Sequence, residues 1–227
     1  MSDIPNWKVW LSYLSEIHIE SAPSEWNPHL YVSMKRGRLQ LSTARAVYSF
    51  SDLYSNFRRS FKQTNFAALP GQEVLLLGLG LGSVPYMLET VFGRQFRYTA
   101  VEIDDSVIYL ANKYVLQQLE SPIEIIETNA YTYVEQCDRQ FDLIIMDVFL
   151  DDIIPASFQK MDYLQSLKRL LRPGGALYYN RLAQTREDKK LSMDFYKQKF
   201  QPVFPNAVCL DVQGNYMLIS DEAVLED

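Results

Sequence analysis

Apolar, strand-like runs alternate with amphipathic segments over the last two thirds of the chain. The strand-like runs are 74–77, 97–103, 123–127, 141–147 and 176–180. The segments between them repeat apolar residues at helical spacing and predict helices over 83–91, 106–119, 130–136 and 157–171. Continuous apolar runs are typical of strands that are covered on both faces, so the alternation favours a parallel sheet with crossover helices. The last of these helices is predicted to stop at the Arg-Pro-Gly-Gly sequence at 172–175.

The C-terminal end adds a different element. A further helix is predicted over 186–200, followed by strands over 207–212 and 216–220. The link at 213–215 is too short to hold a crossover, so these two strands are predicted to be antiparallel. The expected fold class is therefore α/β, with a seven-stranded, mostly parallel sheet that ends in an antiparallel hairpin.

The first 70 residues have a pattern of their own. They predict a short helix over 7–14, strands over 16–20, 29–34 and 38–42, and a helix after Ser51 that carries Leu53, Phe57 and Phe61 on one stripe. The glycine-containing link at 35–37 suits a β-hairpin, and Leu-Pro-Gly at 69–71 breaks the chain. We therefore predict a small N-terminal hairpin and helix appendage over 1–70 and an α/β domain over 71–227.

The composition, with 48% hydrophobic and 22% charged residues, is that of a globular protein and excludes a disordered tail. The net charge of −6 is uneven, because 1–70 carries 8 Lys and Arg against 5 Asp and Glu, whereas 71–227 carries 14 against 23. An acidic chain has no overall attraction for phosphate backbones, so we expect no nucleic-acid partner. Arg169 and Arg172, on a predicted helix and at its end, are expected at the solvated surface.

Metal binding and secretion find no support in the sequence. Cys137, Cys209, His18 and His29 do not have the spacing of zinc ligands, and two cysteines cannot form a disulfide framework. The N-terminus lacks the charged start and apolar run of a signal peptide, and no segment has the length of a membrane span. We expect a cytoplasmic protein with no metal site and no membrane attachment.

Gly78, Gly80 and Gly82 alternate with leucines directly after the strand at 74–77, and a helix is predicted to follow. Glycines there allow a tight turn and a close approach of the backbone to a ligand, while the helix N-terminus offers unpaired amides. A dinucleotide fingerprint needs glycine or alanine where this chain has Ser83, so NAD is disfavoured. The motif is either a cofactor cradle or a structural turn.

Carboxylates stand at the end of the second predicted strand. Glu102 follows Gly78 by 24 residues, and an acid there can accept both hydroxyls of a ribose. The alternative for Glu102 is an exposed strand-end acid. For Asp104 and Asp105 there is a further alternative, in which one of them simply caps the helix that follows.

These motifs together resemble the class I S-adenosylmethionine-dependent methyltransferase fold, and more closely its spermidine synthase branch, over about residues 37–221. The branch places Glu-Ile-Asp, then Asp-Ala, then a strand-end Asp after the glycine loop. The counterparts here are Glu102 with Ile103, Asn129 with Ala130, and Asp147. The resemblance implies a Rossmann-like domain that binds the ribose at Glu102, the adenine amino edge at Asn129, and the acceptor at Asp147.

The resemblance also reaches into the N-terminal appendage. Gln40 matches the glutamine of the family's N-terminal hairpin, which touches the cofactor, and Tyr48 matches a tyrosine of its substrate motif. The family further implies a homodimer as a reasonable assembly. The cofactor is expected to be S-adenosylmethionine or, alternatively, its decarboxylated form.

Three departures distinguish this chain from true aminopropyltransferases. Their glycine motif carries an acid as its fourth residue, which binds the amine of the decarboxylated cofactor and repels the carboxylate of the intact one, and this chain has Leu81 there. Their polyamine-gripping acids are absent from 44–50, where Arg45 has the wrong sign for a dicationic substrate. Asn129 in place of Asp keeps an acceptor oxygen but loses the charge.

Transfer from a sulfonium requires an in-line nucleophile whose proton is accepted nearby, and Asp147 is the natural base. The alternative for Asp147 is a carboxylate that caps a neighbouring loop. Asp151 and Asp152 either assist at the acceptor or belong to an ordinary acidic loop.

Three functions follow from these observations. The first is methyl transfer from S-adenosylmethionine to a small polar acceptor. The second is aminopropyl transfer to an amine, as in polyamine synthesis. The third is a catalytically degenerate protein that kept the nucleoside cradle and serves as a binding or scaffolding protein.

Overall fold

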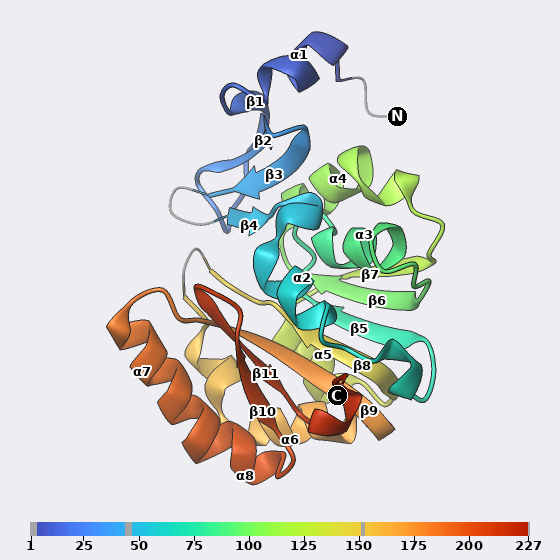
Figure 1. Cartoon of the computed structure of the whole chain (residues 1–227), viewed down its shortest axis with the longest axis vertical. Coiled ribbons are helices and arrows are strands. Elements are labelled where there is room, and N and C mark those ends of the chain that lie inside the picture. The colour runs from blue at the N-terminus through green and yellow to red at the C-terminus, as the bar shows by residue number, and fades with distance from the viewer. Residues whose placement is uncertain (1–3, 44–46, 151–152, 227) are drawn as a thin grey trace.

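The computed structural model describes residues 4–43, 47–150 and 153–226. A seven-stranded sheet in the order β10-β11-β9-β8-β5-β6-β7 forms its centre (Figure 1). The strands are β5 (Glu73–Leu77), β6 (Arg97–Glu102), β7 (Ile123–Glu127), β8 (Phe141–Met146), β9 (Leu171–Leu182), β10 (Val208–Asp211) and β11 (Asn215–Ile219). Strands β5 to β9 are parallel, whereas β11 is antiparallel to both β9 and β10. The predicted α/β, Rossmann-like fold with a C-terminal antiparallel hairpin is confirmed.

The strand order reverses direction at β5. The chain builds β6 and β7 on one side of β5 and then returns to its other side to build β8 and β9. In open α/β sheets such a reversal opens a crevice at the carboxyl ends of the two strands that flank it. The crevice here is expected between the ends of β5 and β8.

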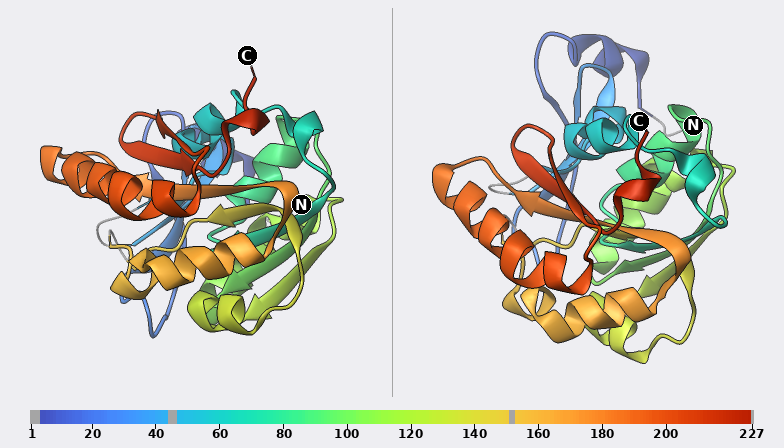
Figure 2. Two further views of the ribbon diagram at one scale, coloured as in Figure 1. Left: turned by 90° about the horizontal axis from the view of Figure 1, so that it is seen from below. Right: turned by 60° about the horizontal axis from the view of Figure 1, so that its bottom comes forward.

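Helices cover both faces of this sheet (Figure 2). One face carries α2 (Ser55–Phe61), α3 (Ser83–Thr90) and α4 (Asp105–Tyr114), and the other carries α5 (Ala130–Gln136), α6 (Met161–Arg169), α7 (Arg186–Phe195) and α8 (Gln201–Val203). Alternate residues of each strand serve the two layers, so Val74 and Leu76 pack on the first side while Leu75 and Leu77 pack on the second. In the described part of the chain, no helix is long and apolar enough to cross a bilayer.

The N-terminal segment forms a separate antiparallel sheet of β1 (Ile17–Ala22), β2 (Leu30–Lys35), β3 (Arg38–Ser42) and β4 (Val47–Ser49), preceded by α1 (Asn6–Leu11). The predicted hairpin is present, with Lys35 opposite Arg38. An apolar cluster that includes Val32 and Leu41 docks this sheet on α4, beside which Glu20 accepts hydrogen bonds from Lys113 and Tyr114.

Helix α2 belongs to the central layers although it lies before residue 70. Its Phe57 and Phe61 are buried in the core beside the central sheet. Leu53, predicted on the same stripe, lies instead in a separate 3₁₀ turn, Ser51–Leu53, because the chain leaves the helical conformation at Tyr54.

Several predicted boundaries need correction. The helix expected over 157–171 is a turn, Ala156–Gln159, followed by α6, and Leu171 already begins β9. Leu171 pairs with Phe141 at a register shift, so the Pro-Gly-Gly sequence lies at the irregular start of a strand rather than after a helix. The helix expected over 186–200 ends at Phe195 and continues as a π-helical turn, Tyr196–Phe200.

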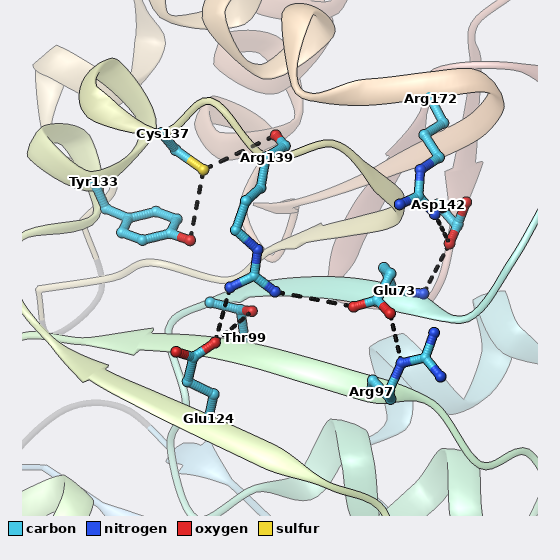
Figure 3. Close-up of polar contacts among 9 residues, drawn as sticks. All are labelled: Glu73, Arg97, Thr99, Glu124, Tyr133, Cys137, Arg139, Asp142 and Arg172. Carbon is cyan, nitrogen blue, oxygen red and sulfur yellow. Dashed lines mark hydrogen bonds and ion pairs between the residues drawn. The ribbon is translucent and has the colours of Figure 1, made fainter.

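The amino edge of the central sheet holds a group of ion pairs, drawn in Figure 3. Fully buried Asp142 accepts hydrogen bonds from the Arg172 guanidinium at 2.9 Å and from the backbone N–H of Glu73 at 2.8 Å. Arg169 donates to the carbonyl oxygens of Val134 and Cys137 at the end of α5. Both arginine side chains are solvated as expected, with 48% of Arg169 and 41% of Arg172 exposed, and each also donates to acceptors at the end of a buried element.

Candidate active site

A cavity of about 810 Å³ lies where the strand order predicts it, at the carboxyl ends of β5, β6, β7 and β8. The N-terminal segment and the ends of β9 and β11 contribute the rest of its wall. Of the candidate cofactor, acceptor and catalytic residues, those that line it are Gln40, Tyr48, Gly78, Gly80, Glu102, Ile103, Asn129, Ala130 and Asp147, and the candidate capping residue Asp104 lines it too. Gly82 is not among the lining residues, and Asp151 and Asp152 lie outside the described residues, as does Arg45.

The glycine loop connects β5 to α3 at the centre of the cavity. At Gly78, where φ is +88°, a Cβ would collide with the backbone carbonyl oxygen of Asp147, so glycine allows the ends of β5 and β8 to approach each other. Gly82 is the N-cap of α3 with φ of +79°, and a Cβ there would lie 2.6 Å from Leu116. The first glycine thus shapes the cavity, and the last one shapes helix packing.

Leu81 does not face the cavity. Its side chain is 1% exposed and packs in the apolar cluster between the N-terminal sheet and α4. The fourth position of the glycine motif therefore contributes packing in this protein.

Glu102 ends β6 and holds the glycine loop. Its carboxylate accepts hydrogen bonds from the backbone N–H groups of Leu79 at 3.0 Å, Ile103 at 2.8 Å and Asp104 at 3.1 Å. A carboxylate has about four acceptor sites, so about one is left for a ribose hydroxyl, one fewer than the sequence reasoning assigned. Burial raises the pKa of Glu102, and the three N–H groups partly offset that rise.

Asp104 is a structural residue. It caps α4 by accepting from the N–H of Ser106, and it also accepts from Ser24 and from the side chain of Asn27. The capping alternative was correct for this residue.

Asn129 caps α5. Its side-chain oxygen accepts from the N–H groups of Tyr131 at 2.8 Å and Thr132 at 3.4 Å. The sequence predicts that this oxygen accepts a hydrogen bond from the adenine amino group, but in the structure it accepts from the first N–H groups of α5. The amide NH₂ of Asn129, a donor, is the group left for a ligand.

Gln40 and Tyr48 bring the N-terminal sheet to the cavity. Gln40 is buried, and its amide donates to Ser42 at 2.7 Å. The hydroxyl of Tyr48 donates to Asn27 at 2.8 Å, and Asn27 in turn donates to Asp104. Tyr48 therefore links β4 to the start of α4 as well as lining the cavity.

Asp147 directly follows β8 at the floor of the cavity. One carboxylate oxygen accepts from the Asn180 amide at 2.8 Å, and the other accepts from the Tyr54 hydroxyl at 3.1 Å. Burial raises the pKa of Asp147 to about 6, the two hydrogen bonds oppose that rise, and the charge of Glu102 adds to it. A carboxyl group with this pKa is largely ionised at neutral pH and suited to accept a proton.

Sequence reasoning missed three polar residues around Asp147. The sequence pattern places Tyr54 in an amphipathic helix, Asn180 at the end of an apolar strand, and Asn215 in a turn. All three line the cavity. The signal that could have found Asn180 is a buried amide in an otherwise apolar run, since such a group needs a partner.

The carboxylates of the cavity mostly accept hydrogen bonds from uncharged donors of the protein itself. Besides the three acids already described, Asp188 lines the cavity and accepts from the N–H of Thr185 in the capping box of α7. Lys35 lines the cavity too, and no described carboxylate forms an ion pair with it.

A doubly wound sheet with a glycine loop and a strand-end acid at its switch point defines a Rossmann-like domain. The chain belongs to the spermine/spermidine synthase domain family, whose model matches residues 67–212.

Two curated relatives show what kinds of enzyme resemble this chain. It is 29% identical over 112 residues to a polyamine aminopropyltransferase of Vibrio vulnificus, covering 48% of this chain and 37% of that protein. It is also 29% identical over 147 residues to an eEF1A lysine and N-terminal methyltransferase homolog of Drosophila pseudoobscura pseudoobscura, covering 61% of this chain and 21% of that protein. The chain thus spans well under half the length of both relatives, and they carry out two different transfers.

A solved structure supports the fold. A probable spermidine synthase from Corynebacterium glutamicum superimposes with a TM-score of 0.68 at 19% identity, covering 90% of this chain and 79% of that one. The chain has the fold shared by spermidine synthases and S-adenosylmethionine-dependent methyltransferases, and its homologues are enzymes of both types.

Proposed function

We propose that this protein transfers the methyl group of S-adenosylmethionine to a small polar acceptor, with Asp147 as the base. The observation that carries the proposal is the environment of Leu81. Where the resemblance expects an acid that selects the decarboxylated cofactor, this side chain is apolar and buried away from the cavity. The described glycine loop therefore presents no carboxylate that would repel the carboxylate of the intact cofactor.

The residues around the cavity suit an adenosyl group. The remaining acceptor site of Glu102 fits a ribose hydroxyl, and the amide NH₂ of Asn129 fits an acceptor nitrogen of a base. Bound S-adenosylmethionine supplies an electrophilic methyl group on a sulfonium. The acceptor nitrogen or oxygen would take this methyl group, with the thioether form of the cofactor as leaving group, and Asp147 would take the proton that the acceptor loses.

Aminopropyl transfer is the second candidate, because an aminopropyltransferase is among the relatives. The cavity argues against it. A dicationic acceptor needs several carboxylates with free acceptor capacity. Asp104 is engaged by side-chain and backbone donors, Glu102 keeps about one acceptor site, and Lys35 adds a positive charge among the described lining residues.

Calorimetric titration of the purified protein with S-adenosylmethionine, its decarboxylated form and methylthioadenosine tests the proposal. We expect the intact cofactor to bind at least about tenfold more tightly than the decarboxylated one. A preference for the decarboxylated form would overturn it in favour of aminopropyl transfer. Absence of binding by all three ligands would refute both transfer activities.

The role of Asp147 needs a separate assay. Methyl transfer from methyl-tritiated S-adenosylmethionine is measured with a panel of small amines, hydroxy acids and short peptides. Asp147→Asn is expected to lower kcat by about 100-fold or more with little change in cofactor affinity. Full turnover by this variant would refute the assignment of the base.

A further inference from the structure

We propose that Asn180 and Asn215, together with Tyr54, are positioning residues that set the orientation of the Asp147 carboxylate. The proposal rests on Asp147 being the base, as proposed above. The three residues come from β9, β11 and the segment that precedes α2, so the carboxylate is held from both sides by elements far apart in sequence.

Both carboxylate oxygens of Asp147 accept a hydrogen bond from a side-chain donor. Asn180 donates to Oδ1 at 2.8 Å, and Tyr54 donates to Oδ2 at 3.1 Å. Two donors on two different oxygens restrict rotation of the carboxylate about its Cβ–Cγ bond. The remaining lone pairs of both oxygens are then available in a fixed direction toward the cavity.

Asn215 helps to fix the orientation of the Asn180 side-chain amide. The NH₂ group of Asn215 donates to the side-chain oxygen of Asn180 at 2.9 Å. Asn180 is only 2% exposed, so its side-chain amide depends mainly on these protein partners. A flipped Asn180 amide would place its oxygen against a carboxylate oxygen of Asp147 and its NH₂ against that of Asn215, and both contacts are repulsive.

The position of Asn215 follows from the register of β11 against β9. Asn215 faces Leu182 in the antiparallel pairing of β11 with β9, and Asn180 faces Met217, so the two amides are diagonal neighbours across the ladder. Cross-strand diagonal pairs are within reach of side chains of this length. The antiparallel hairpin thus has a role beyond completing the sheet, because it supplies the group that orients Asn180.

Groups from several elements influence the ionisation of Asp147. From β6, the negative charge of Glu102 raises the pKa of Asp147, and from the N-terminal segment the Tyr54 hydroxyl lowers it. Burial and the neighbouring Asp147 hold the pKa of Tyr54 well above its usual value, so its hydroxyl keeps the proton it donates. Strands β9 and β11 contribute the uncharged amides of Asn180 and Asn215, and of these Asn180 lowers the pKa of Asp147. Asp151 and Asp152, later in the same loop, lie outside the described residues.

The test measures the titration of Asp147 directly in the ligand-free full chain by carboxyl ¹³C NMR. Asn180→Leu is expected to raise the pKa of Asp147 by about one unit, because the charged carboxylate loses a donor. Asn215→Leu leaves that donor present but unoriented, so we expect a smaller rise of about half a unit. Tyr54→Phe is a further variant in case Asn180→Leu does not fold, and Asn206→Leu, at an exposed position, is the matched control.

The same variants are then compared by the acid limb of the kcat/KM profile against pH, which should move upward in parallel with the titration. An Asp147 pKa that is unchanged in Asn215→Leu would overturn the proposed role of Asn215, and unchanged values in all three variants would overturn the whole network. A shift in the titration without a shift in the acid limb supports the network but refutes Asp147 as the base. Failure of the positioning proposal and failure of the proposed function therefore give different results.

Discussion

Replacing Asp147 by asparagine is expected to make the folded protein more stable at neutral pH, although it removes the base. In the folded protein the pKa of Asp147 is raised from its ordinary value of 3.8 to about 6, chiefly by burial. The folded state therefore binds this proton more tightly than the unfolded chain does. As pH rises through the window from about 4 to 6, the wild-type protein loses stability, because the ionised carboxylate is better solvated in the unfolded chain.

The size of the effect follows from the shift. A rise of about two units corresponds to at most about 3 kcal/mol of lost stability above pH 7. Because Asp147 lines the cavity and is only partly buried, and because the asparagine fits the Tyr54 hydroxyl less well, we expect a gain of about 1–2 kcal/mol for Asp147→Asn at pH 7.5. The gain should be much smaller at pH 4.5, where the folded wild-type carboxyl is mostly protonated.

Urea unfolding of wild type and Asp147→Asn at pH 4.5 and 7.5 measures this difference. The matched control is Asp138→Asn, because the Asp138 side chain is 100% exposed and its replacement should have little effect at either pH. The reasoning is refuted if Asp147→Asn has the same stability as wild type, or less, at pH 7.5, or if its advantage does not grow between the two pH values.

Three further substitutions test other parts of the structure. Arg172→Leu leaves the buried Asp142 carboxylate without its cation and should lower the free energy of unfolding by about 2–3 kcal/mol in urea, with cofactor affinity in calorimetry unchanged because the pair lies at the opposite edge of the sheet. Glu102→Gln should weaken S-adenosylmethionine binding by about tenfold in the same titration, and unchanged affinity would contradict its role at the ribose. Gly78→Ala should cost more than about 2 kcal/mol in thermal denaturation because its Cβ meets backbone, whereas Gly93→Ala, with a positive φ but open space around it, should cost less; equal losses would show that the close strand approach is unimportant.

The cavity could be located from the sequence because its central residues stand at predictable places. Gly78 and Asp147 each follow a strand of a parallel sheet and Glu102 ends another, and the carboxyl ends of parallel strands meet at one edge. Their roles could be predicted less well. The oxygen of Asn129 caps α5 and three acceptor sites of Glu102 are filled by the backbone, details that depend on local geometry rather than on residue type.

Other features depended on which elements lie next to each other. Leu81 follows Gly80 in the chain, yet it packs against the N-terminal sheet while Gly80 lines the cavity. No local pattern distinguishes these two orientations, because they are decided by where the N-terminal sheet docks. The same holds for Arg172, whose buried partner Asp142 is 30 residues away in the sequence.

The sequence by itself determined the fold class, the succession of strands and helices along the chain, and the placement of glycines and acids at the carboxyl edge of the sheet, because hydrophobic periodicity and glycine placement are local properties of the chain. Only the tertiary structure decided that Tyr54, Asn180 and Asn215 surround Asp147. These four residues lie on elements up to 161 residues apart, and their meeting depends on strand order and antiparallel register. Hydrogen bonds act over about 3 Å, so a polar network of this kind exists only once the sheet has brought its members together.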